Sequence, residues 1–420
     1  MESICLFLKK FWGITCDANA TFPTLNLLIA LLLSSLLLGF AVSNIIMIGF
    51  SLSVLCFTLT HKIKPRFNAI TYVFFIFYIF MLLSWFWSID KNQTEIALQR
   101  NIHYFLIPFI FAFLPEFKAA SKEFIFRFFS ISMLIYAAFF LMMGIIFYIQ
   151  TGNVSKLSHH GLVSPLGLNR VMVSVFMATA FLYWILKKEK SVLKYFAIIL
   201  LSFFLILLSS KTIIISTLLL TFVILSIQFK KSSFSKYSWV ILLPIIPLVI
   251  YFSTLINRKF VSEMIPRYHE IIYKDNFGYD YYFNGAELRI LYTRFLIEFN
   301  KEEPIFFKGF GLAASQSKIK EKTAQCNIWP EYGNRFNFHN QFNQNMAELG
   351  IFGVVLLIVI LGYGFIHAFR NKEWFFLSFL LIFTAFLITD TPLSQQRGIY
   401  VFLIVYFVFL KSEKKISLDI

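Results

Sequence analysis

A short polar stretch carries the residue best suited to chemistry, His339. Residues 337–353 read NFHNQFNQNMAELGIFG, so a nearly uncharged polar run passes directly into an apolar one at Gly350. Asn337 is placed to cap a helix that starts with these polar turns. A histidine there can serve as a general base, because imidazole exchanges its proton near neutral pH. The alternative is a polar helix cap that happens to contain a histidine.

Other candidate groups are less specific. Asp90 is expected to be a turn residue rather than a second base. Asp390 and Arg397 flank the segment TDTPLSQQRG and are expected to pair with each other, unless Arg397 contacts a substrate. The doublet His159-His160 has no third ligand spaced for a metal, and the four cysteines are scattered. The sequence contains no Walker motif and no dinucleotide fingerprint.

The composition limits which elements can position these groups. The chain has 420 residues, of which 58% are hydrophobic, 19% aromatic and 14% charged, and its mean hydropathy is +0.73. Soluble domains are about 45–50% apolar and about 25% charged. A soluble enzyme and an intrinsically disordered chain are therefore both excluded. The expected environment is a lipid bilayer.

Twelve apolar runs are long enough to cross a bilayer. Backbone groups in lipid must bond within their own segment, so these runs are expected to be helices. The predicted fold class is an all-α polytopic membrane protein. The twelve predicted spans are 24–40, 43–60, 70–88, 102–116, 124–149, 168–186, 193–209, 211–228, 238–256, 350–369, 374–389 and 398–411.

The basic residues predict the orientation of these spans. The formal net charge is +16. With both chain ends cytoplasmic, 20 of the 38 Lys and Arg residues lie in inner segments and six in short outer loops. That asymmetry follows the positive-inside rule. The charge is thereby explained by topology, which argues against nucleic acid as a partner.

One long segment is polar. Residues 257–338, between the ninth and tenth spans, hold 12 basic and ten acidic residues. Long segments without structure of their own are uncommon in compact proteins. We therefore expect a helical subdomain on the outer face. The predicted division is 1–256 for spans one to nine, 257–338 for the loop, 339–411 for the polar helix start and last spans, and 412–420 for a cytoplasmic tail.

Several motifs together resemble the bacterial O-antigen ligase family, within the ligase and polymerase superfamily of polysaccharide assembly. His339-Asn340, nine residues and then Gly350-x-x-Gly353 resemble its HN-x9-GxxG signature. The turn WSID at 87–90 resembles its WS-D element, and KGFG at 308–311 resembles its GxG element. Arg289 resembles the loop arginine that precedes GxG.

The resemblance implies a membrane glycosyltransferase at the periplasmic face of a bacterial inner membrane. Its donor would be a glycan on undecaprenyl pyrophosphate, its acceptor a sugar hydroxyl of lipid A–core, and no metal, nucleotide or other cofactor would be needed. His339 and Arg289 would be catalytic, with Arg170, Lys211, Asn340 and Arg397 binding substrate. Lys211 departs from the family, which has arginine there, and lysine lacks the two-pronged guanidinium. Arg170 could compensate, or could be an interfacial residue that snorkels.

Two other functions compete with this one. A polymerase of the same superfamily would use the same lipid-linked donor and extend a growing glycan instead. A secondary transporter would be expected to carry charges or helix breaks near the middle of its spans. The spans here are nearly free of charge, and the candidate groups lie at their outer ends.

Overall fold

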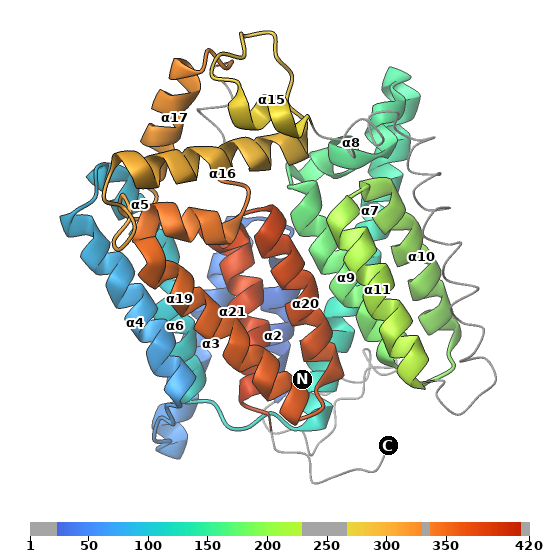
Figure 1. The fold of residues 1–420 in the computed structure, drawn as a ribbon. Helices are drawn as coiled ribbons and strands as arrows, with labels where there is room; N and C mark the ends of the chain where they lie inside the picture. Colours follow the sequence, from blue (N-terminus) through green and yellow to red (C-terminus); the bar gives the residue numbers. More distant parts are fainter. Residues whose placement is uncertain (1–22, 229–266, 330–336, 413–420) are drawn as a thin grey trace.

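The computed structural model describes residues 23–228, 267–329 and 337–412, which fold as helices without β-sheet (Figure 1). Between the longer helices lie the short α8 (His159–Val163) and the 3-10 turns η1 (Ser84–Phe86), η2 (Val154–Leu157), η3 (Ser164–Leu166) and η4 (Pro392–Ser394). The longer helices are α2 (Pro23–Ser35), α3 (Phe40–His61), α4 (Ala69–Leu83), α5 (Lys91–Asn101), α6 (His103–Ala112), α7 (Ala119–Thr151), α9 (Arg170–Leu186), α10 (Val192–Leu208), α11 (Lys211–Gln228), α15 (Tyr268–Tyr273), α16 (Gly285–Glu302), α17 (Ser315–Gln325), α19 (Gln341–Arg370), α20 (Trp374–Thr389) and α21 (Gln396–Leu410).

Each predicted span within the described residues contains a helix. Among the residues that the structure describes, four helical segments are long and apolar enough to cross a membrane, namely α3, α4 with η1, α7 and α19. A fifth forms if α8–η3 and α9, which meet at a bend of 88°, make one span. The helices α2, α10, α11, α20 and α21 are apolar but shorter. The chain is thus a multi-pass membrane protein, and the count of twelve stays a prediction. The predicted ninth span, Cys5, Cys16 and residues 413–420 lie outside the described residues.

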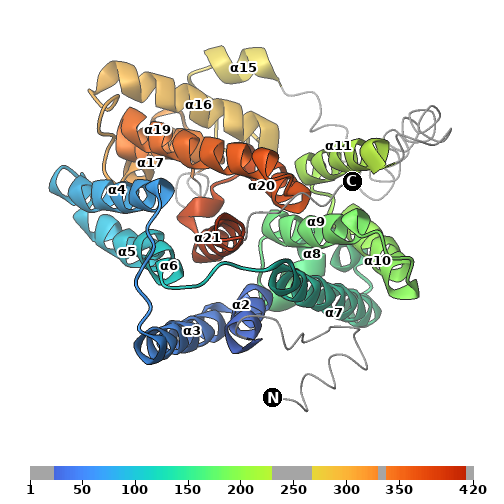
Figure 2. The ribbon, with the colours of Figure 1, turned by 90° about the horizontal axis from the view of Figure 1, so that it is seen from below.

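The centre of the bundle is α21, which neighbouring helices surround (Figure 2). Every side chain from Gly398 to Phe409 is buried. A helix that is apolar on all sides needs such surroundings. Aromatic rings fill much of the contact area, as where Phe376 stacks on Phe409 with ring centroids 4.9 Å apart. Burying a phenylalanine side chain contributes about 1.5–3 kcal/mol. The bundle core is therefore a rigid support for the loops at its ends.

Residues 267–329, which belong to the loop expected between the ninth and tenth spans, form helices around a small core, and the loop's bounds and its side of the membrane stay predictions. Its main helix, α16, carries apolar residues at a spacing of three and four along one face, including Leu288, Leu291, Phe295 and Phe299, and buries them in a small core of its own. Helices α15 and α17 complete that core. In Figure 1, α16 lies across the upper ends of the bundle helices. The subdomain thus covers one end of the bundle.

Helix α19 is bent where its polar turns meet its apolar ones. Gly350 has φ 65° and ψ −162°, which is not helical, and the chain continues as helix on both sides (Figure 1). Only glycine adopts this backbone conformation without strain. Residues 341–349 consequently run beneath α16, while residues 351–370 run along the bundle. The bend gives the polar helix start its own direction.

Candidate active site

His339 lies immediately before α19, in a turn held by asparagines. Its backbone has φ 46°, a left-handed conformation that is uncommon outside glycine. Its N–H donates to the Asn337 side chain over 2.9 Å. Asn340 is the N-cap of α19 and accepts from the N–H groups of Phe342 and Asn343. The predicted cap at Asn337 is wrong by three residues, because Asn337 holds the turn before the helix instead. The imidazole is thereby fixed at the helix start.

Asp390 faces this imidazole. Its Oδ1 lies 3.8 Å from the Nδ1 atom of His339. The carboxylate is 7% exposed, and it accepts hydrogen bonds from Asn169 and from the N–H of Thr391. Burial favours a raised pKa for Asp390, but the neighbouring His339, the hydrogen bond from the N–H of Thr391 and the charge of Arg289 lower the pKa below its ordinary value of 3.8. Asp390 is consequently an ionised partner for His339 at neutral pH.

Asp390→Asn should destabilise the protein at neutral pH, and the difference should vanish in acid. The stabilisation that comes from a lowered carboxyl pKa is complete above the unfolded value, near 3.8, and is lost as pH falls through the folded value. Unfolding temperatures of the wild type and variant in detergent test this. We expect a constant gap between about pH 5 and 7 that narrows below about pH 4. A gap that persists unchanged to about pH 3 would contradict it.

Arg289, in the loop subdomain, also lies near Asp390. Its Nε and Nη2 atoms donate to the carbonyl of Thr389, over 3.0 and 2.8 Å, and its Nη1 donates to the carbonyl of Gly285. A capping box formed by Asn284 and Glu287 fixes the start of α16 one turn earlier. Arg289 therefore joins the loop helix to the end of α20, directly beside Asp390.

Two more predicted cations lie at the starts of α9 and α11. Arg170 follows Asn169, the N-cap of α9 that also donates to Asp390. Its Nη1 lies 2.8 Å from Nδ1 of His159 and 3.3 Å from the carbonyl of Ser209, in the turn that leads into Lys211. A continuous set of contacts thus connects His339, Asp390, Arg170 and the Lys211 turn. Helix starts carry partial positive charge, which adds to that of the cations.

Arg397 lies apart from this set. Its Nε donates to the carbonyl of Leu36 over 2.8 Å, and its guanidinium stacks on Phe40 with 4.4 Å to the ring centroid. The predicted pair of Asp390 with Arg397 is wrong, because each has other partners. Asp90 is a turn residue as predicted, and it caps α5 by accepting from the N–H of Gln93.

The remaining motifs dock on one another. The indole of Trp87 donates to the carbonyl of Lys308, and the N–H of Ile89 donates to the carbonyl of Phe310. A Cβ on Gly311 would lie 2.6 Å from Ser88, so the two backbones approach as closely as glycine permits. The WSID turn and the KGFG segment therefore form a structural contact rather than a catalytic one.

The KGFG segment also packs into the bend of α19. The N–H groups of Phe310 and Gly311 donate to the carbonyls of Ala347 and Glu348, and the N–H of Ile351 donates to the carbonyl of Phe306. A Cβ on Gly309 would lie 2.3 Å from the carbonyl carbon of Glu348, and one on Gly350 would lie 2.3 Å from that of Phe307. We call these paired segments, 306–311 and 347–351, the backbone clasp. It attaches the loop to the helix that begins beside His339.

Sequence reasoning missed Asn169 and the contact of Asp390 with His339. Asn169 precedes an apolar run and is recognisable as a helix cap, but its bond to residue 390 depends on the fold. Within the described ranges, no group of three or more His, Cys, Asp or Glu side chains could hold a metal ion. The site offers a base, its acidic partner and three cations, a set suited to transfer away from a phosphate group.

Comparison with known proteins adds one match. Residues 196–358 match the family model described as O-antigen ligase, a range that holds Lys211, Arg289, His339 and the backbone clasp. A search of curated proteins finds no match. The family has a glycosyltransferase-like function in the O-antigen ligase and polymerase superfamily and acts on lipid-linked glycans. Residues 196–358 of this multi-pass membrane protein are thus similar to the O-antigen ligase family.

Proposed function

We propose that the protein is an O-antigen ligase, which transfers a glycan from undecaprenyl pyrophosphate to a sugar hydroxyl of lipid A–core. One observation carries the proposal. His339 and Asp390 meet Arg289, Asn169 and Arg170 at one end of the bundle, under the loop helix α16. A base and several cations within one set of contacts are what displacement of a pyrophosphate requires.

In the proposed reaction, the acceptor hydroxyl attacks the anomeric carbon of the donor sugar. Its proton passes to Nε2 of His339, because a neutral imidazole that turns Nδ1–H toward Asp390 carries its basic lone pair on Nε2. The bond between the anomeric carbon and the phosphate oxygen breaks, and the electron pair leaves with undecaprenyl pyrophosphate. Attack opposite the leaving group inverts the anomeric centre. Retained configuration in the product would contradict this step.

Arg289, Arg170 and Lys211 stabilise the negative charge that develops on the leaving pyrophosphate. A guanidinium group can donate two parallel hydrogen bonds to the oxygens of a phosphate, whereas lysine acts as a point charge. Arg170 contacts the turn before Lys211 and supplies the planar group that lysine lacks. Asn340 shapes the turn that holds His339. Arg397, at the start of α21, contacts the end of α2 and the start of α3, and it is assigned no direct contact with the reacting atoms.

We place the site on the periplasmic face of the inner membrane, with twelve spans and both termini cytoplasmic. The predicted inner cations Lys122 and Lys187 pair with Glu373 and Glu123. Lys187 follows the end of α9 opposite to Arg170, and 17 helical residues separate the two by roughly 25 Å. In this orientation the basic residues lie at the inner end and the candidate site at the outer end, as the positive-inside rule predicts. The polyprenyl chain of the donor would remain in the membrane.

Lipopolysaccharide gels combined with analysis of lipid carriers test the proposal. A deletion strain should accumulate long glycan on undecaprenyl pyrophosphate and leave lipid A–core bare, and the wild-type gene should restore transfer. If lipid A–core instead carries a single repeat unit in the deletion strain, elongation has failed, and the protein is a polymerase of the same superfamily. If both the lipopolysaccharide and the carrier lipids are unchanged in the deletion strain, the protein is neither the ligase nor the polymerase.

A further inference from the structure

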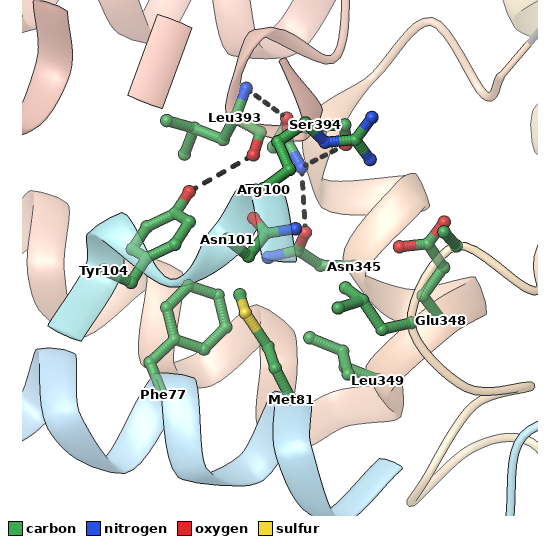
Figure 3. Close-up of a pocket in the computed structure, with 13 residues that line it drawn as sticks. Phe77, Met81, Arg100, Asn101, Tyr104, Asn345, Glu348, Leu349, Leu393 and Ser394 are labelled. Atoms are coloured by element: carbon green, nitrogen blue, oxygen red, sulfur yellow. Dashed lines mark hydrogen bonds between the residues drawn. The ribbon is translucent and has the colours of Figure 1, made fainter. Parts of the chain in front are cut away.

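A small cavity beside the proposed site has polar walls that the proposed reaction leaves without a role (Figure 3). It lies between α4, α5 and α6 on one side and the first turns of α19 and η4 on the other. Its volume is about 30 Å³. One ordered water needs about 10–15 Å³ on this measure, so the cavity holds about two waters and excludes a sugar ring.

Arg100 and Glu348 approach this cavity from opposite walls (Figure 3). The Nε atom of Arg100 is buried without a hydrogen-bond partner among the described residues. Burial lowers the pKa of Arg100, and the charge of Glu348 opposes that change. The two side chains are near enough to interact electrostatically, although they form no direct ion pair within the described part of the chain. A buried N–H group without a hydrogen-bond partner is costly.

Glu348 is attached to the loop subdomain and to its own helix. It is 6% exposed and accepts hydrogen bonds from Ser315, Gln344 and the N–H of Ala313. Gln341 lies two helical turns before Glu348. It donates to Asn345 over 2.9 Å and accepts from the N–H of Leu393 over 2.9 Å. The cavity walls thus include the side chains that hold residues 341–348 against the segment following Asp390.

We propose that ordered water in this cavity bridges Arg100 to Glu348, and that this hydrated ion pair positions the first turns of α19 and so the imidazole of His339. The lining supplies at least four polar partners, namely Arg100, Asn101, Asn345 and Glu348, which is what a buried water requires. Arg100 is therefore a positioning residue on α5. The inference rests on the proposed role of His339 as the base.

The physical reason for a strong effect is the pairing of buried charge. Removing one member leaves the other without its compensating partner, whereas removing both restores neutrality. The turn that carries His339 lies only two residues before Gln341, so a shift of α19 moves the imidazole away from the acceptor hydroxyl. Displacements near 1 Å in such positions can lower rates by about 10²-fold. The effect should fall on catalysis rather than on donor binding.

A double-mutant cycle on the full-length protein in detergent tests the proposal. The variants are Arg100→Gln, Arg100→Lys, Glu348→Gln and the double Arg100→Gln with Glu348→Gln, assayed by transfer from a polyprenyl-pyrophosphate glycan to lipid A–core. Lys91→Gln removes an exposed positive charge from the same helix and is the matched control. His339→Ala, run in parallel, tests the proposed function separately.

We expect Arg100→Gln to lower kcat about 10-fold or more with donor KM changed less than about twofold, and the double variant to recover most of the loss. Arg100→Lys should recover part of it, and Lys91→Gln should match the wild type. Additive losses in the double variant, or a raised KM with unchanged kcat, would overturn the proposal. Equal kcat per folded molecule with only lower thermal stability would overturn it as well. If His339→Ala retains full activity, the proposed function itself fails.

Discussion

His339→Ala should abolish detectable glycan transfer while leaving the protein folded in the membrane. General base catalysis contributes about 10²–10⁴-fold in rate, which corresponds to about 3–5 kcal/mol of barrier. The loss should appear in kcat, because the base acts on the acceptor proton and not on the lipid-linked donor. Steady-state transfer by purified variants, matched for the amount of folded protein, measures the effect.

Two further variants separate chemistry from backbone conformation. His339 has φ 46°, which asparagine adopts more readily than most residues, so His339→Asn keeps the turn and removes the base. It should be as inactive as His339→Ala, and its unfolding temperature should lie closer to the wild-type value than that of His339→Ala. His269→Ala is the control. His269 is exposed on α15 in the loop subdomain, and this variant should leave transfer intact. Activity in His339→Asn near the wild-type level would refute the assignment of the base.

Gly350→Ala should disrupt the backbone clasp and remove transfer with it. A Cβ at this position would lie 2.3 Å from the carbonyl carbon and 2.4 Å from the oxygen of Phe307, atoms that cannot move without the loop. The backbone conformation alone costs about 1–3 kcal/mol for a residue other than glycine. We expect a lower unfolding temperature and faster proteolysis of the loop around 306–311.

Gly362→Ala is the matched control in the same helix. No atom lies within 4 Å of a Cβ built there. Alanine is favoured over glycine inside a helix by about 1 kcal/mol, so this variant should be as stable as the wild type or slightly more so. The prediction for Gly350 fails if both variants unfold at the wild-type temperature and resist protease equally.

Much of the fold could be predicted because lipid imposes simple rules. Apolar runs of sufficient length must form helices in a bilayer, and each described run does so. His339 could be selected because a polar helix start at a membrane edge is unusual. Likewise, Asp90 ends the short WSID turn and is a local cap, which neighbouring residues alone determine.

Contacts between distant segments could not be predicted in this way. Their closeness in sequence predicts a pair of Asp390 with Arg397, but η4 turns the chain between them and directs them to different helices. The bend at Gly350 depends on the carbonyl of Phe307, more than 40 residues earlier. Arg100 and Glu348 line the same cavity although they lie far apart in the sequence. A single sequence contains no signal for such pairs.

The backbone clasp also decides which parts of the molecule can move during turnover. Three main-chain hydrogen bonds join residues 306–311 to the bend of α19, so the loop and the helix bearing the base must travel as one rigid body. Any movement of helices that admits a bulky lipid-linked substrate must then occur at a different interface. The junction of η3 with α9, where the axes turn by 88° beside Arg170, has no comparable tie to the loop helix among the described residues. We therefore expect a lipid-linked substrate to enter and leave at that junction, while the proposed base stays in place.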